Sequence, residues 1–236
     1  MPIKIRIRWI PLLATVMVVV IGVSLGQWQT RRAVEKEAIE QKLSERASAP
    51  AITLGREKMA IDTIEYRRLI VRGEFDKGWP IYLENRPHDG VAGFHVLMPF
   101  KIADSDMHLL VARGWAPRAT ADRAQLPKYD TPVGITEIQG IAVRKPGHVM
   151  QLGDASAIRP SVILQNLDIE QFSAASKLAM QGFMLEQTND AHDGLVRDWP
   201  RPSTGIERHR GYAFQWYGLA LTALIFFVVT GFRRGK

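Results

Sequence analysis

The chain has 236 residues, no cysteine, and 31 Lys and Arg against 24 Asp and Glu, for a formal net charge of +7. Without cysteine it can form no disulfides, thiolate nucleophiles or thiolate metal ligands of its own. Most of the excess basic charge lies in residues 1–28 and 211–236, so the central part is close to neutral. It therefore lacks the basic face on which nucleic-acid binding depends, and we expect no nucleic-acid partner.

The first element is the uncharged apolar segment 9–28, which begins at Trp9 and ends at Trp28. Its 20 residues would form a helix ~30 Å long, the thickness of a bilayer core, with an aromatic residue at each interface. A cleaved signal peptide is the alternative, but its apolar region is shorter and a small-residue cleavage site should follow. The pattern predicts a transmembrane helix over 9–28 and a cytoplasmic tail over 1–8.

Residues 29–49 combine strong helix formers with interleaved acidic and basic side chains. This composition predicts a solvated helical stalk that continues the first span. Pro50 ends it, because proline disfavours helical geometry in the residue before it.

Residues 50–210 change to short β-branched segments separated by turn signals such as His88-Asp89-Gly90. They predict a mostly antiparallel β domain with one or two helices, one of which would begin after Asp168 as its N-cap. The polar segment 188–210 is expected to be a loop that returns to the membrane. The predicted strands are 66–75, 80–87, 93–102, 108–117, 136–144, 161–168 and 182–187, with a helix over 169–180.

A second uncharged apolar stretch predicts a transmembrane helix over 211–232, followed by a short basic tail, 233–236. Basic residues at both chain ends favour cytoplasmic termini and an extracytoplasmic central domain. The fold class is therefore α+β, with two transmembrane helices flanking a mostly antiparallel β domain.

Both spans carry small residues four positions apart, Gly22 and Gly26 in the first and Gly218 and Thr222 in the second. This spacing lets helices approach closely. The two spans could pack on each other or on a partner, and the sequence leaves both arrangements open.

No catalytic or metal-binding signature emerges from the sequence. The six histidines show no metal-ligand spacing, and neither a phosphate-binding nor a dinucleotide-binding loop is present. Gly22 to Gly26 match the nucleophile-elbow pattern, but they lie inside an apolar span instead of a strand–turn–helix. A membrane-anchored hydrolase would need a nucleophile and base that the sequence does not display, so we predict a protein that is not an enzyme.

Five stretches, in this order, resemble the surfeit locus protein 1 family, a family of cytochrome c oxidase assembly factors: LGQWQTRR (25–32), VRGEFD (71–76), ENRPHDGVAGFHVLMPF (84–100), LLVARGWAPR (109–118) and RHRGYAFQWYGLA (208–220). The resemblance implies a membrane-anchored assembly factor for haem-copper cytochrome c oxidase in a bacterial inner membrane, with its domain in the periplasm. It implies as partners the largest oxidase subunit, the haem a synthesis enzymes and the lipid bilayer.

The resemblance also implies transient binding of haem a and help with its insertion. A haem iron needs an axial donor, usually neutral imidazole, and His209 lies at the entrance to the second span. The expected haem contacts add guanidinium groups for the propionates and aromatic rings for the macrocycle, which gives His209, Arg208, Arg210, Tyr212 and Trp216. The alternative for these residues is an interfacial anchor, since all these residue types favour that depth. The alternative function is a haem-free structural chaperone of the nascent subunit.

A second group of residues could grip the oxidase subunit. The alternative for the Arg113-Gly114-Trp115 turn is a packed structural role, and Trp28 could be an ordinary interfacial aromatic. The expected partner-binding residues are Trp28, Gln29, Arg86, Arg113, Gly114 and Trp115.

Overall fold

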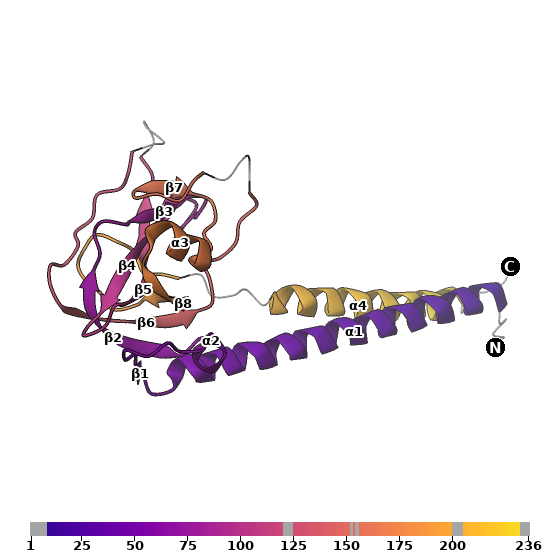
Figure 1. Cartoon of the computed structure of the whole chain (residues 1–236). Coiled ribbons are helices and arrows are strands. Elements are labelled where there is room, and N and C mark those ends of the chain that lie inside the picture. The colour runs from indigo at the N-terminus through magenta and orange to yellow at the C-terminus, as the bar shows by residue number, and fades with distance from the viewer. Residues whose placement is uncertain (1–8, 120–124, 152, 154–155, 200–204, 232–236) are drawn as a thin grey trace, which may run out of the picture. The chain divides into compact units, whose positions relative to one another are not determined.

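A computed structural model describes residues 9–119, 125–151, 153, 156–199 and 205–231. The chain divides into two compact units (Figure 1). One unit contains both chain ends, residues 1–42 and 201–236, and the other contains residues 43–200.

The first unit contains the two helices of the described chain that are long and apolar enough to cross a membrane. Helix α1, Trp9–Ser48, runs without a break from the predicted span through the predicted stalk. Helix α4, Ile206–Gly231, begins five residues before the span predicted over 211–232, so the end of the expected loop is helical. The tails predicted for residues 1–8 and 233–236 lie outside the described residues.

Helices α1 and α4 pack against each other through the small residues of the first span (Figure 1). A methyl group on Gly22 would lie 3.0 Å from the Trp216 carbonyl oxygen, and one on Gly26 would lie 2.6 Å from the Tyr217 ring. Gly218 has open space where a methyl group would be. The Gly22–Gly26 pair therefore packs the two spans on each other, whereas the Gly218–Thr222 spacing takes no part in this packing.

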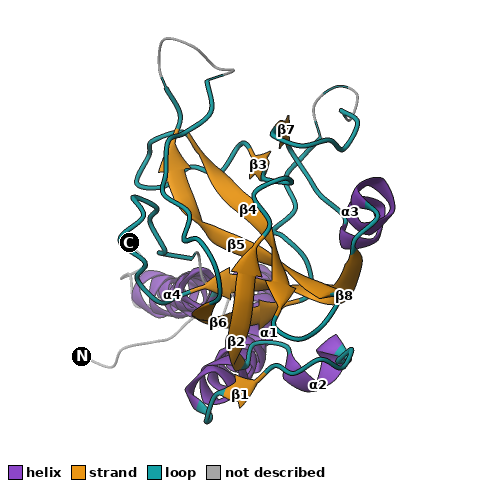
Figure 2. Cartoon of the chain, turned by 60° about the vertical axis from the view of Figure 1, so that its left-hand side comes forward, coloured by secondary structure: helices purple, strands orange, loops and turns teal. Residues whose placement is uncertain are grey.

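The second unit is built around a closed barrel (Figure 2). The strands pair in the cycle β2–β6–β8–β5–β4 and back to β2. Most pairings are antiparallel, as expected, but β1–β2, β3–β7 and β5–β8 are parallel. The barrel strands are β2 Arg68–Phe75, β4 Gly93–Ile102, β5 Met107–Pro117, β6 Thr136–Val143 and β8 Ala179–Gln187.

Three short strands and two short helices complete the domain. Strand β1 (Ile52–Thr53) extends one edge through β2, and β3 (Ile81–Leu83) with β7 (Val162–Leu164) extends the other through β4. Helix α2 is a single turn, Ile61–Ile64, and α3 spans Ile169–Ser176.

Helix α3 begins where the sequence predicted and ends earlier than predicted. The Asp168 carboxylate accepts the backbone N–H groups of Glu170 and Gln171, as an N-cap should. The helix predicted to run to 180 ends four residues earlier, because β8 begins at Ala179. Strand β8 is also longer than the segment 182–187 predicted for it.

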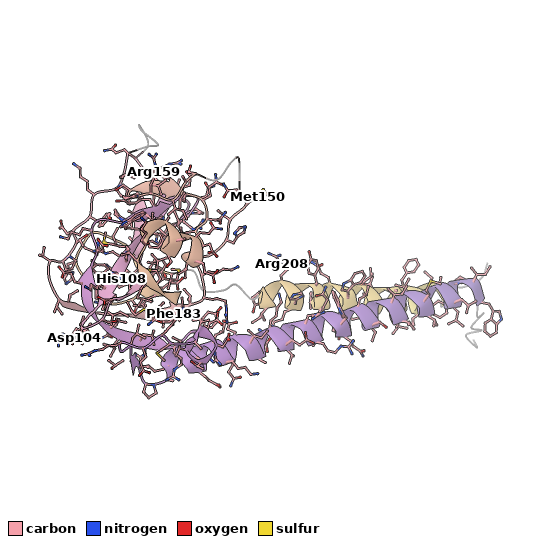
Figure 3. All side chains as sticks on the ribbon, in the orientation of Figure 1. Asp104, His108, Met150, Arg159, Phe183 and Arg208 are labelled. Atoms are coloured by element: carbon pink, nitrogen blue, oxygen red, sulfur yellow. The ribbon has the colours of Figure 1, made fainter. Side chains whose placement is uncertain are left out.

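The barrel interior is filled by alternate residues of its strands, as the period of two in strand geometry requires. A second apolar layer lies between the outer faces of β4, β5 and β8 and the group formed by β3, β7 and α3. Phe183, which is labelled in Figure 3, is one of the side chains inside the barrel. The interior side chains include Leu69, Val71, Phe75, Met98, Phe100, Leu109, Val111, Ile138, Phe183 and Leu185.

Glu186 in β8 makes domain stability depend on pH. Its partly buried carboxyl is desolvated, which raises its pKa to about 7. In the unfolded chain the pKa would be 4.5, so folding takes up a proton between these values and stability falls as pH rises through 7. We expect Glu186→Gln to stabilise the domain by on the order of 2 kcal/mol at pH 8 and to have little effect at pH 4. Urea denaturation at both pH values measures this, and an equal effect at the two would contradict it.

Candidate functional site

The helix unit contains a polar contact between residues 180 positions apart. The Nδ1 atom of His209 in α4 lies 2.6 Å from the Oε1 atom of Gln29 in α1. A carbonyl oxygen can only accept, so this hydrogen bond requires the proton on Nδ1, and in the neutral ring Nε2 then has the lone pair. Among the described residues, Nε2 has no hydrogen-bond partner. The contact thus engages Nδ1 and leaves Nε2 as the ring nitrogen that could accept a ligand bond.

Close packing of the helices holds this contact in place. Gln29 is only 9% exposed, and Ala33, one turn further along α1, is 3% exposed. The approach at Gly26 brings the Tyr217 hydroxyl within 3.5 Å of the Thr30 hydroxyl. The Gly22–Gly26 pair therefore sets the helix separation at which Gln29 can reach His209.

Helical spacing divides the predicted haem contacts between faces of α4. His209, Tyr212 and Trp216 are three and four residues apart and share one face, with Arg208 one turn before Tyr212. Arg208 is exposed at the start of α4 (Figure 3).

Arg210 does not join this group. It follows His209 by one position, so it projects from another side of the helix. Its guanidinium lies 2.8 Å from the Glu37 carboxylate and 3.3 Å from that of Glu207. Arg210 therefore remains a predicted propionate contact that lies on another side of α4 from His209 and is engaged by two carboxylates.

The chemistry of this donor set fits a haem. Neutral imidazole is the commonest axial ligand of haem iron, and Nε2 of His209, which has no hydrogen-bond partner in the described part of the chain, could supply it. Tyr212 and Trp216 offer aromatic surface on the same face of α4, and Arg208 offers a cation for a carboxylate.

Trp28 and Gln29, the two α1 residues that were expected to bind a partner, have different environments. Trp28 is 45% exposed and remains available to a partner or to lipid. Gln29 is buried against α4 and uses its carbonyl for His209. The prediction that Gln29 contacts a partner span is therefore corrected, because its side chain faces its own chain.

In the domain, Arg86 and Trp115 form a packed structural unit. The Arg86 guanidinium donates to the carbonyl oxygens of Gly147 at 2.7 Å and Gln165 at 3.1 Å. The Trp115 Nε1–H donates to the Arg86 carbonyl oxygen at 2.6 Å. Both side chains are buried, so they tie down loops and present little surface to an oxidase subunit.

Arg113 lies inside the barrel, where it is 0% exposed. Its guanidinium donates to the Asp193 carboxylate at 2.6 Å, to the Thr131 hydroxyl at 2.5 Å and to the Asp130 carbonyl oxygen at 2.7 Å. It also stacks over the Phe75 ring at 4.6 Å. A partner cannot touch Arg113 in this fold, so the expected partner-binding role is corrected to a structural one.

Gly114 lets the segment that carries Asp193 lie against β5. A methyl group at Gly114 would lie 2.7 Å from the Leu195 side chain and 2.9 Å from the Val196 carbonyl oxygen. The backbones of Trp115 and Val196 exchange hydrogen bonds beside it. Gly114 is therefore covered by its own chain. Its predicted role in partner binding is corrected to a role in packing.

The sequence prediction missed Asp193 and Arg197, which lie in the segment treated as a polar loop. Burial raises the pKa of Asp193, but the hydrogen bond and charge of Arg197, with the charge of Arg113, outweigh it and hold the pKa below its usual range. Arg113 continues the inward series Leu109, Val111, so an inward-facing arginine was the signal that a buried acid must exist.

The described residues beside β7 line a hollow that is smaller than a cofactor pocket. A polar hollow of about 80 Å³ opens there, lined in part by Glu84, Asn166 and Gln171. Cofactor pockets are typically ~300–1,000 Å³. This hollow is therefore too small to hold a haem.

Comparison with known proteins supports one family. The sequence profile of the SURF1 family matches residues 16–221. A SURF1-like protein of Rickettsia bellii is 28% identical over 221 residues, which covers 91% of this chain and 88% of that protein. Surfeit locus protein 1 of Mus musculus is 29% identical over 219 residues, covering 86% and 70%, and that of Xenopus tropicalis is 31% identical over 159 residues, covering 59% and 50%.

Proposed function

Because the chain belongs to the SURF1 family, we propose that it is a membrane-anchored assembly factor for cytochrome c oxidase that binds haem a and assists its insertion into the largest oxidase subunit. The family is one of oxidase assembly factors, and two apolar helices make the chain a membrane protein. The observation that supports the haem step is His209, whose Nδ1 contacts Gln29 and whose Nε2 has no hydrogen-bond partner among the residues that the structure describes.

We place the protein in a bacterial inner membrane, with the barrel domain in the periplasm and both chain ends in the cytoplasm. Both helices together supply two crossings, which return the chain to the side from which it started. The basic residues at the ends favour the cytoplasmic side. In this orientation His209, at the start of α4, lies near the periplasmic surface of the bilayer.

Each residue at this site has a defined task. With haem bound, Nε2 of His209 would donate to the iron, Arg208 would pair with a propionate, and Tyr212 and Trp216 would contact the macrocycle. The haem itself supplies the iron centre that the oxidase will use. His209 would be the single protein ligand of the iron, and its side chain is partly exposed. This suits a haem that must leave again, because its release would break only one coordination bond.

The test is the absorption spectrum of full-length protein purified from cells that make haem a, beside His209→Ala. We expect a haem a band in the wild type that is lost in this variant. His192→Ala is the matched control, since His192 is 90% exposed in the domain and should keep the band.

A band that survives His209→Ala would place the ligand elsewhere. A wild-type protein without haem a, in a strain whose oxidase is lost on deletion of the chain, would instead favour a haem-free chaperone. That role is compatible with the large apolar side chains, such as Phe214 and Leu219, that α4 leaves exposed.

A further inference from the structure

We propose that Gln29 is a positioning residue for the His209 ligand: it fixes the imidazole tautomer and ring orientation so that Nε2 faces the haem. This inference rests on the proposed haem binding by His209. It assigns to an α1 residue a role in a site otherwise built from α4.

The geometry supports this role in three ways. The Gln29 Oε1 atom lies 2.6 Å from Nδ1, which is a short contact for a neutral N–H donor. Gln29 is 9% exposed, so water competes little for its carbonyl. Its backbone belongs to a helix packed against α4 at Gly22 and Gly26, so the acceptor has a fixed position relative to α4.

A metal-bound histidine commonly donates its second ring N–H to a carbonyl or carboxylate, which fixes the tautomer and raises the basicity of the ligand nitrogen. Free imidazole can place its proton on either nitrogen, and only one tautomer has a lone pair on Nε2. An acceptor at Nδ1 selects that tautomer before haem arrives. Gln29 is placed to do this, whereas the neighbouring Thr30 hydroxyl donates to its own helix at Gly26.

The first experiment needs no haem. Apo protein labelled with ¹⁵N-histidine is studied by NMR at pH 8, and the His209 signals are assigned by their loss in His209→Ala. We expect the Nδ1–H tautomer in the wild type and in Thr30→Val, and a shift towards Nε2–H in Gln29→Leu, which keeps the size of the side chain but has no acceptor. The same tautomer in Gln29→Leu as in the wild type would overturn the proposal.

The second experiment uses the haem-loaded protein and a series of acceptors. Gln29→Leu should bind haem about 10- to 100-fold more weakly than the wild type, and Thr30→Val should match the wild type. Gln29→Glu should keep haem and lower its reduction potential, since a carboxylate acceptor gives the imidazole more anionic character and favours ferric iron. Gln29→Leu should raise the potential.

The two proposals fail in different ways. Haem affinity and potential unchanged across the Gln29 series, with the band still lost in His209→Ala, would reject the positioning role and keep haem binding. A wild-type protein that binds no haem a would reject both, even if Gln29 controls the tautomer of the apo protein.

Discussion

Replacement of Asp193 by alanine should destabilise the barrel domain by about 3–5 kcal/mol. Asp193 is 1% exposed and accepts from two guanidinium groups, those of Arg113 and Arg197, each at 2.6 Å. Its loss leaves the fully buried Arg113 charge without its counter-ion, and the desolvation of that charge is then uncompensated. Urea denaturation of the full-length protein in detergent, followed by near-ultraviolet circular dichroism, measures the change.

Asp190→Ala is the matched control. Asp190 is an aspartate three positions away, 68% exposed and 4.0 Å from Arg197, and its loss should cost less than about 0.5 kcal/mol. The triple variant Arg113→Met, Asp193→Leu and Arg197→Met should recover most of the lost stability, because replacing all three partners leaves no unpaired buried charge. Equal effects of Asp193→Ala and Asp190→Ala would contradict the buried-pair interpretation.

The strand predictions succeeded where local patterns determine the structure. Segment 93–102 coincides with β4, and segment 136–144 differs from β6 by one residue, because alternating apolar residues bounded by turns identify a strand without knowledge of its partner. Closure of the barrel could not be predicted in this way. It depends on which strands pair, and the parallel β5–β8 pair joins segments separated by more than 60 residues.

The site shows a similar division. His209 could be proposed from its residue type and its place beside an apolar span. The role of Gln29 could not, since it depends on how α1 and α4 are aligned, which no local pattern specifies. The separation of Arg210 from His209 was available from helical geometry, because consecutive residues of a helix face different sides. Its partner Glu37 was not, because it belongs to the other helix.

Arg113 illustrates a harder case. An arginine beside glycine and tryptophan has the composition of an exposed binding turn, and arginine is seldom fully buried unless it is paired. Its partner Asp193 is 80 residues away in a polar segment with no periodicity. Burial of Arg113 therefore follows from a long-range pairing, and only its place two residues after the interior residue Val111 hinted at it.

Gly73→Ala should also destabilise the domain strongly, by about 3 kcal/mol, because Gly73 lies where the barrel closes. In β2 it is paired both with Thr136 of β6 and with Ile102 of β4. A methyl group at this position would overlap the backbone carbonyl oxygen of Lys101 and lie 2.7 Å from the Phe100 ring. Backbone in a paired strand cannot move aside cheaply, so the β2–β4 pairing must open or distort.

Gly182→Ala is the control that separates this clash from the general effect of adding a side chain to a strand. Gly182 lies in β8, and a methyl group there would meet nothing within 4 Å. Its replacement should change the free energy of unfolding by less than about 0.5 kcal/mol. In Gly73→Ala, hydrogen exchange should show that protection is lost mainly at the backbone amides of β2 and β4. An equal loss of protection in all barrel strands would instead mean that the β2–β4 pair does not open separately from the other strand pairs. Equal stability of the two variants would mean that the β2–β4 contact is not required to close the barrel.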